Sequence, residues 1–252
     1  KRRGNQEHHP VHEAKTSYGY DEVSSKLLRH CMEELIPPLV HIVNGSFRES
    51  TFPKRLKFSK VYPKLKKGDI TQLNNYRPIS LVPTFSKVLE RVALARLIKH
   101  VERYGLLTTA QHGFTKYRST NTAIIDLVET MIDHIEEGNT ATGIFLDLSK
   151  AFDCLSHSLI LEKLKSMGVR GTAADWFSSY LSDRSQMVEI QHKINSKITT
   201  VRSKPLPIKS GVPQGSVLGP VLFILFVNDM PSQLEELAKF TCTQTIPSSL
   251  LG

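Results

Sequence analysis

The sequence predicts an α+β protein in which helices pack on a sheet, and three observations lead to this class. Apolar residues recur with the period of a helix in two long segments, 84–104 and 119–137. Shorter apolar or alternating segments at 142–147, 187–191 and 198–202 have the length and pattern of strands instead. The 252 residues contain no internal repeat and no low-complexity linker, so we expect one continuous body whose basic first half can form its own lobe.

Composition excludes several classes of protein. With 40% hydrophobic and 23% charged residues, the chain can bury a core and is not expected to be disordered as a whole. No apolar run approaches the roughly 20 residues that cross a bilayer, so we expect no membrane partner. The first ten residues are polar, which predicts no secretory signal. Three widely spaced cysteines argue against a disulfide framework or a zinc ribbon and favour a reducing compartment, nuclear or cytoplasmic.

The net charge of +9 is concentrated in one part of the chain. Residues 47–118 hold 16 Lys and Arg against four Asp and Glu, a local charge of +12, and the remainder carries −3. This division indicates a polyanionic partner, nucleic acid above all, although a merely solvated basic surface is an equal alternative on charge alone. Basic residues alternate with apolar ones across 54–67, which predicts a strand or hairpin with a solvated basic face.

Local signals place the elements of the first half after a loose opening of about twenty residues. Helical periodicity begins near Ser24 and should stop at Pro37-Pro38, because proline lacks the donor that the helix ladder needs. Gly105 should end the helix that begins at residue 84, since glycine readily adopts the left-handed conformation of a C-terminal cap. The other expectations are a short helix at 39–47, a turn at Gly68-Asp69 and extended backbone at 76–79.

In the second half, the apolar run 142–147 is too short for a core helix and is expected to be a buried strand. Two helices, at 156–167 and 172–181, should precede the hairpin of the two alternating strands. Residues 211–230 should begin with a turn and continue as an apolar helix. The ten histidines show no metal-ligand spacing, so we interpret His112 and His157 as structural, and Trp176 as part of the core.

Asp147 is the most informative single residue. It ends the apolar run, where an uncompensated carboxylate is costly to bury. It can cap the helical turn that Ser149 to Phe152 would begin, or it can bind a divalent cation that compensates its charge. The cap is the better interpretation of Asp147 taken alone, but the motifs around it favour the cation.

Two segments carry a family resemblance: Phe145-Leu-Asp-Leu-Ser-Lys-Ala-Phe-Asp153 and Gly211-Val-Pro-Gln-Gly-Ser-Val-Leu-Gly-Pro220. Both strongly resemble signature motifs of reverse transcriptases, in particular those of non-LTR, LINE-type (jockey-like) retrotransposons. Further family blocks are matched in the expected order by Asn75–Leu81, Lys87–Arg91 and Gln111–Thr120, and the earlier Gly19–Glu22 and Phe52-Pro53 fit as well. The resemblance extends from about Lys15 to Ser232, and five ordered motifs make a chance match implausible.

The resemblance implies a right-hand polymerase fold with fingers and a partial palm, in which helices pack on an antiparallel palm sheet and the thumb is absent. It divides the chain into a loose segment (1–20), a basic fingers-like region (21–138), a partial palm (139–240) and an aberrant tail (241–252). The implied reaction is the addition of dNTPs to a DNA primer on an RNA template with Mg²⁺ or Mn²⁺. The sequence specifies no oligomeric state.

The resemblance also implies roles for particular residues. Asp147 matches the family's first metal-binding aspartate, with the Leu148 carbonyl as a further ligand, since two-metal catalysis needs oxygen atoms that hold both cations. Arg77 would grip the triphosphate bidentately. Phe152 matches the aromatic residue that excludes a ribose 2′-OH, although core packing is an alternative role. Gln214, Gly215 and Ser216 would lie against the templating base and nucleotide, Gly211 would allow a close backbone approach, and Lys64 and Lys66 are weaker candidates for contacting phosphates.

One expected motif, Tyr-Ala-Asp-Asp, does not follow the Gly211 segment. Residues 239–247 read Lys-Phe-Thr-Cys-Thr-Gln-Thr-Ile-Pro, whose codons can encode Tyr-Ala-Asp-Asp-Thr when read from the third base of the Cys242 codon. We therefore expect a frameshift or misplaced gene-model junction near 240–242 and a polymerase fragment, cut at both ends, with little or no activity. The alternatives are a non-catalytic nucleic-acid-binding remnant of a transposable element and a relic that hardly folds.

Overall fold

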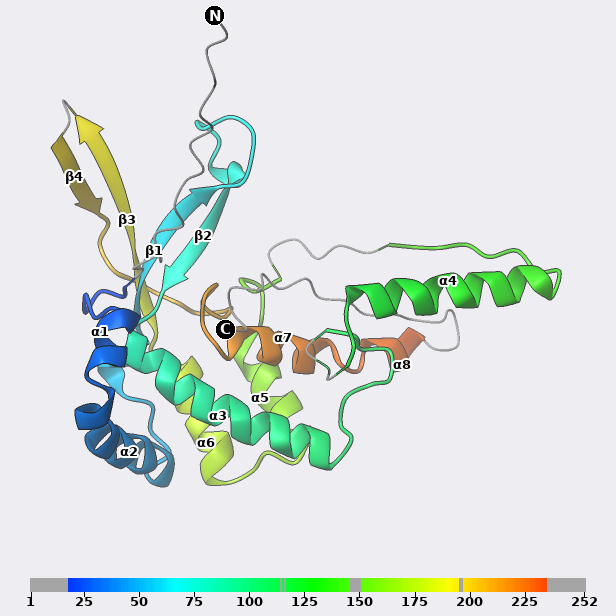
Figure 1. Cartoon of the computed structure of the whole chain (residues 1–252), viewed down its shortest axis with the longest axis horizontal. Helices are drawn as coiled ribbons and strands as arrows, with labels where there is room; N and C mark the ends of the chain where they lie inside the picture. Colours follow the sequence, from blue (N-terminus) through cyan, green and yellow to red (C-terminus); the bar gives the residue numbers. More distant parts are fainter. Residues whose placement is uncertain (1–17, 114, 116, 146–150, 195–196, 235–252) are drawn as a thin grey trace, which may run out of the picture.

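The computed structural model describes residues 18–113, 115, 117–145, 151–194 and 197–234, and Figure 1 shows their arrangement. The α+β class predicted from the sequence is confirmed. The helices are α1 (Ser25–His30), α2 (Met32–Arg48), α3 (Thr84–Arg103), α4 (Thr120–Glu136), α5 (His157–Ser166), α6 (Thr172–Leu181), α7 (Gly219–Val227) and α8 (Met230–Leu234), with short 3-10 turns at Lys54–Lys57 and Leu73–Asn75. The strands are β1 (Phe58–Leu65), β2 (Tyr76–Leu81), β3 (Ser185–Ile194), β4 (Lys197–Arg202) and β5 (Leu206–Pro207).

The sheet has the order β2-β1-β3-β4, and β5 adds to β3. The β3–β4 hairpin is antiparallel, as predicted, and β1 also pairs antiparallel with β2, but β1 and β3 run parallel, so the described sheet departs from the antiparallel arrangement expected for the palm. The parallel pair is possible because more than a hundred residues of helix and loop connect the two strands. The predicted division at residue 138 stays a prediction, although the β1–β3 pair crosses it.

Two lysines of the basic segment are buried: Lys60 in strand β1 and Lys57 in the 3-10 turn just before it. Lys60 of β1 is 3% exposed, and its Nζ lies 3.2 Å from Oε1 of Glu189 on β3, whose other oxygen accepts a hydrogen bond from Arg202 of β4. Lys57 is also buried, and burial lowers the pKa of its ammonium. The prediction of a solvated basic face is therefore wrong for Lys57 and Lys60, which the parallel neighbour β3 and the adjoining loop cover.

The predicted helix stop at Pro37-Pro38 is also wrong. The helical conformation is interrupted at Cys31 instead, and α2 then continues through both prolines to Arg48. The separate helix expected at 39–47 therefore does not exist. The C-terminal half of α2 packs on α6, where Trp176 Nε1 donates to Ser46 Oγ at 2.9 Å and the rings of Phe47 and Trp176 stack at 4.9 Å. These tertiary contacts offset the two backbone hydrogen bonds that the prolines cannot donate.

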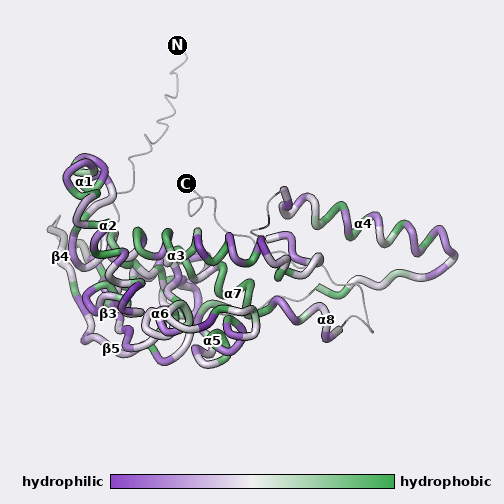
Figure 2. Tube along the Cα trace, turned by 90° about the horizontal axis from the view of Figure 1, so that it is seen from below, coloured by the Kyte–Doolittle hydropathy of each residue, from purple (hydrophilic) through white to green (hydrophobic). Residues whose placement is uncertain are grey.

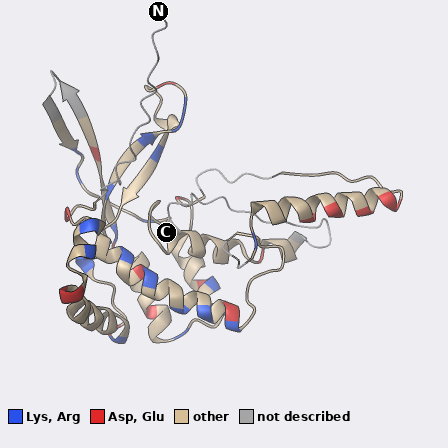
Figure 3. Ribbon diagram, in the orientation of Figure 1, with Lys and Arg blue, Asp and Glu red and all other residues tan. Residues whose placement is uncertain are grey.

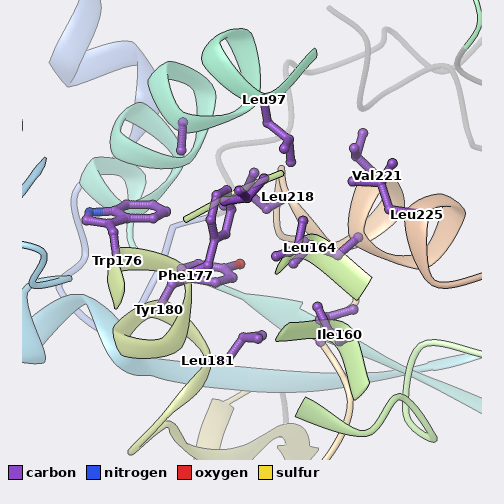
Figure 4. Packing of buried hydrophobic residues seen from close by; sticks show 14 of the residues in the cluster. Leu97, Ile160, Leu164, Trp176, Phe177, Tyr180, Leu181, Leu218, Val221 and Leu225 are labelled. Atoms are coloured by element: carbon purple, nitrogen blue, oxygen red, sulfur yellow. The ribbon is translucent and has the colours of Figure 1, made fainter. Parts of the chain in front are cut away.

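The hydrophobic core lies between α3, α5, α6 and α7, and Figure 4 shows side chains from these helices meeting in one cluster. Trp176 and Tyr180 of α6 are buried there, with their rings stacked at 5.9 Å, which confirms Trp176 as a core residue. The helix predicted at 84–104 is confirmed as α3, and Gly105 follows it with a φ of 58°. The apolar helix predicted after residue 211 is confirmed as α7, which begins at Gly219.

In contrast, α4 projects from the body (Figure 1), and Figure 2 shows green apolar and purple polar residues alternating along it. The helix itself was predicted correctly, and Ser119 forms a capping box with Thr122. Five of its large apolar residues are exposed, however, Leu127 and Met131 are half-buried, and only Ala123 is buried. The strand predicted from 142 is not formed at 142–145, where Ile144 and Phe145 are exposed, because no described strand lies beside this segment to pair with it. Across the described residues, no helix is both long and apolar enough to cross a membrane.

Candidate functional site

The loop 211–219 leads into α7 and packs against the end of the Asp147 motif, at Phe152 and Asp153. Gly211 has a φ of 81°, and a Cβ there would lie 2.6 Å from the Phe152 carbonyl oxygen and 2.7 Å from that of Asp153. Its N–H donates to the Leu155 carbonyl at 2.7 Å, and the N–H of Val212 donates to that of Phe152 at 2.8 Å. Only glycine combines this backbone conformation with such a close approach, as predicted for Gly211.

The other side of the loop lies against β2. Gly215 has a φ of 129°, and a Cβ there would come within 2.5 Å of the Ser80 carbonyl oxygen. The Ser80 N–H donates to the Gln214 carbonyl at 2.7 Å. Two glycines thus allow three segments, around residues 80, 153 and 213, to meet through their backbones. Each segment carries one of the sequence blocks that support the family resemblance.

Polar side chains hold the loop in one conformation. Gln214 Nε2 donates to both carboxylate oxygens of Asp153, at 3.2 and 3.3 Å. Ser216 is fully buried, and its hydroxyl donates to the Pro213 carbonyl and accepts from the Gly219 N–H. The contacts of Gln214, Gly215 and Ser216 with a nucleotide stay a prediction. In this structure the side chains of Gln214 and Ser216 form hydrogen bonds that stabilise the loop.

Glu90 of α3 connects several segments behind the loop through hydrogen bonds. It is fully buried, and its carboxyl accepts hydrogen bonds from the backbone N–H groups of Val217 and Leu218 at 2.7 and 3.2 Å. The hydroxyls of Ser86 and Tyr180 also donate to it, at 2.7 and 3.3 Å. Burial, and then the proximity of Glu90, hold the pKa of Tyr180 well above its usual range, so the phenol stays a donor. One carboxyl therefore joins α3 and α6 to the start of α7.

Sequence reasoning missed the role of Glu90, although it lies in the matched block Lys87–Arg91. A signal was present, because Glu90 precedes Ala93 and Leu97 by three and seven residues on a predicted helix and so belongs to its buried stripe. A carboxyl at such a position requires partners. The sequence does not reveal that these partners are backbone groups more than a hundred residues away.

Two residues near Gly211 behave as predicted for the fold. The ring of Phe152 is half-buried and lies 5.6 Å from that of Phe223 on α7, which agrees with its alternative role in packing; exclusion of a 2′-OH stays a prediction. His157 Nε2 lies 2.7 Å from the Gly211 carbonyl oxygen, and His112 Nδ1 lies 3.0 Å from Thr122 Oγ1. Both histidines therefore make structural contacts.

The predicted phosphate-binding cations lie together on the β1–β2 hairpin. Lys64 and Arg77 are direct cross-strand partners, and the N–H of Lys66 donates to the Asn75 carbonyl at 2.8 Å. All three side chains are exposed, and within the described residues none of them forms an ion pair. Figure 3 shows basic residues on this hairpin and acidic residues along α4. Like charges directly opposite each other in a sheet destabilise it, which favours an anionic partner for this hairpin.

The predicted metal ligands Asp147 and Leu148 lie outside the described residues, as does the tail after 234. Among the residues that are described, no group of three or more His, Cys, Asp and Glu is arranged to hold a metal ion. The nearby Asp153 is engaged by Gln214, so it is not free to replace the missing second acidic motif.

Comparison with known proteins identifies the class of this chain. A family model described as reverse transcriptase (RNA-dependent DNA polymerase) matches residues 64–244, and the chain belongs to this family. Within it, the chain is similar to polymerases of non-LTR retrotransposons. It is 31% identical over 221 residues to the probable RNA-directed DNA polymerase from transposon BS of Drosophila melanogaster, and 31% identical over 220 residues to that from mobile element jockey of Drosophila funebris.

These alignments cover 86% and 87% of this chain but only 23% of each relative. The chain therefore spans about a quarter of the length of the curated relatives it matches. A more distant relative, the Pol polyprotein of retrotransposable element R2 of Popillia japonica, is 27% identical over 170 residues. The resemblance deduced from the sequence motifs is confirmed at the level of the family.

Proposed function

We propose that this chain forms the fingers and most of the palm of an RNA-directed DNA polymerase that adds dNTPs to a DNA 3′ end on an RNA template. The observation that carries the proposal is the junction at Gly211 and Gly215, where three motif-bearing segments meet through their backbones. A site built on fixed backbone rather than on flexible side chains can hold a base and a nucleotide in one geometry. The setting is intracellular, nuclear or cytoplasmic.

In this proposal each predicted residue has one task. Arg77 binds the triphosphate, Gln214 and Gly215 lie under the base pair, and Phe152 excludes a ribose 2′-OH. Asp147 and the Leu148 carbonyl hold Mg²⁺ or Mn²⁺, and two such ions would stabilise the attacking 3′ oxygen and the leaving pyrophosphate. Lys64 and Lys66 contact the phosphates of the template. Glu90 acts indirectly, because it orients the backbone N–H groups of Val217 and Leu218 within the loop.

We further propose that the chain with the printed sequence has little polymerase activity. Residues 239–247, where the second acidic motif is expected, contain no Asp or Glu. One carboxylate cannot balance two divalent cations. Primer extension on an RNA template with Mg²⁺ tests this: we expect no synthesis above background, and clear synthesis that Asp147→Ala abolishes would contradict the proposed inactivity while supporting the polymerase fold.

The coding DNA tests the origin of the tail. The shifted reading requires G in the third position of the codons for Thr243, Gln244 and Thr245. Any other base at one of these positions rejects the frameshift explanation, and three G bases support it.

The second candidate function is nucleic-acid binding without catalysis, favoured by the unpaired cations Lys64 and Arg77 on the hairpin. Binding to phosphates releases counterions, so the log–log salt slope should be about −0.7 to −0.9 per contact. A double variant, Lys64→Gln with Arg77→Gln, should flatten that slope by about 1.5. The matched control is Lys26→Gln with Arg29→Gln on α1, which removes two exposed charges elsewhere. A flat salt response of the unchanged protein would exclude both candidate functions.

A further inference from the structure

A cavity of about 440 Å³ lies between α2, α3 and the start of α6, three helices that are neighbours in Figure 1. None of its lining residues belongs to the β1–β2 hairpin or to the loop 211–219. On α3 it begins at Ala93 and reaches His100, which places it beyond Glu90 and away from the loop that Glu90 supports. The cavity is therefore separate from the candidate active site.

The cavity has an aromatic wall. Phe47 stacks on Trp176 with ring centroids 4.9 Å apart, and Phe177 lies next to Trp176. The guanidinium of Arg96 covers the Phe47 ring at 4.3 Å from its centroid. A planar guanidinium that rests on one ring can receive a second flat group on its opposite face. Trp176 and Phe177 are buried, and Phe47 and Tyr180 stack on the Trp176 ring, so the surface open to a flat group is the outer face of the exposed Arg96 guanidinium.

The rim of the same cavity is basic. Arg48, Arg96 and Arg170 are exposed and come from three elements: the end of α2, the middle of α3 and the turn before α6. No Asp or Glu lines the cavity, and within the described residues none of these arginines forms an ion pair. Asp175 in the first turn of α6 offsets the positive end of that helix, so the positive charge of the rim comes from the arginines. Three cations on the rim of one cavity, with no carboxylate among its lining residues, favour an anionic ligand.

We propose that this cavity binds one nucleotide unit of a single-stranded nucleic acid, with its flanking phosphates on Arg48 and Arg170 and its base stacked on the outer face of the Arg96 guanidinium. An acidic peptide would satisfy the charges but offers no flat group to stack on Arg96, so the combination favours a nucleotide. The proposal needs no catalytic activity. It assigns the chain a second nucleic-acid contact, beyond Glu90 along α3 toward the C-terminal end of that helix.

The position of Trp176 makes a direct test possible, because it is the single tryptophan of the chain and lines the cavity. Titration with an eight-nucleotide oligo(dT) should change the Trp176 emission, and oligo(U) in a parallel titration shows whether RNA is preferred. An abasic deoxyribose-phosphate strand of equal length should bind more weakly and leave the emission unchanged. No emission change with either oligonucleotide, or displacement of both by an oligo-glutamate peptide at equal concentration, would overturn the proposal.

A matched pair of triple variants tests the arginines. Replacing Arg48, Arg96 and Arg170 by Gln should weaken oligo(dT) binding about tenfold or more in 0.1 M salt and reduce the log–log salt slope by about 1.4, since Arg48 and Arg170 each contact one phosphate and a single-strand phosphate contributes about 0.7. The control replaces three exposed cations outside the cavity: Arg29→Gln, Lys99→Gln and Lys165→Gln. Equal losses in the two variants would reject the site.

A further variant, Ala173→Phe, narrows the cavity without a change in charge and should weaken binding of oligo(dT) but not of the abasic strand. Thermal unfolding of each variant shows whether it folds. The binding result is independent of primer extension, so the cavity proposal and the proposed polymerase can fail separately.

Discussion

Helices α3 and α4 have similar lengths and were predicted with equal strength from their apolar periodicity, yet they have opposite environments. Leu89, Leu97 and Val101 of α3 are each less than 5% exposed. The exposed apolar residues of α4 retain 46–61% of their surface: Ile124, Ile125, Val128, Ile132 and Ile135. Periodicity therefore predicts a helix and its apolar face, whereas burial of that face depends on whether another element lies opposite it.

The surroundings of the two helices explain the contrast. The core side of α3 faces α6 and α7, whose residues fill the space around Leu89 and meet the carboxyl of Glu90. Close to α4, His112 contacts Thr122 and approaches Asp126 near the N-terminal end of the helix. Residues 142–145, which the sequence predicted as a neighbouring buried strand, are exposed. The apolar side of α4 thus has no described sheet or helix on which to pack.

A matched pair of truncations gives the sharpest test of this contrast. Leu89→Ala removes a fully buried side chain and should lower the free energy of unfolding by about 2–5 kcal/mol. Ile132→Ala removes a half-exposed one and should change it by about 0.5 kcal/mol or less. Urea unfolding measures both. If the two variants lost equal stability, α4 would have to be packed in solution, and the comparison would fail.

Glu90 tests whether α3 is tied to the loop by hydrogen bonds as well as by packing. Glu90→Gln places an amide group where the carboxyl accepts four hydrogen bonds, so we expect a loss of about 1.5–3 kcal/mol. Hydrogen exchange at the amides of Val217 and Leu218 should accelerate. The control Glu102→Gln changes an exposed carboxylate on the same helix, and a similar loss there would refute the special role of Glu90.

The stability of α4 should depend on local interactions. Ser119→Ala removes the capping box and should destabilise the helix by about 0.5–2 kcal/mol. Because the apolar side of α4 is exposed, the effect should be confined to its own amides in hydrogen exchange, and the urea midpoint of the core should stay unchanged. A shift of the global midpoint by the full amount would show that α4 unfolds together with the core.

The smallest expected effect is a pH dependence of the stability of the N-terminal turn of α4. Burial, and then the nearby Arg118, lower the pKa of His112 below 6.5, although Asp126 acts in the opposite direction. A lowered histidine pKa means that the folded contact is complete above about pH 6.5 and weakens as the pH falls through the folded value. The protection factors of the first-turn amides of α4, which are corrected for the slower intrinsic exchange at lower pH, should therefore fall on acidification. His112→Gln should remove this dependence, and its persistence would assign it to another group.

Much of the fold could be predicted from short-range patterns. The helices α3, α5, α6 and α7, the β3–β4 hairpin and the family itself were deduced correctly because each depends on local periodicity or on an ordered motif. The failures involve partners distant in sequence. Pro37 and Pro38 stay within a helix because α6 holds its C-terminal half, and Lys60 is buried because β3 lies parallel to β1 and supplies Glu189.

Short-range patterns were sufficient for most helices, the β3–β4 hairpin, the family and the glycine at residue 211, because backbone conformation and motif order are local properties of a chain, but they were not sufficient for α2 or for residues 142–145. Only the tertiary structure decided what each element meets. It pressed Gly211 and Gly215 against backbones from two other segments, gathered four donors on Glu90, and left the apolar side of α4 exposed. The physical reason is that burial and hydrogen bonding depend on neighbours brought together from distant parts of the chain, which no local pattern specifies.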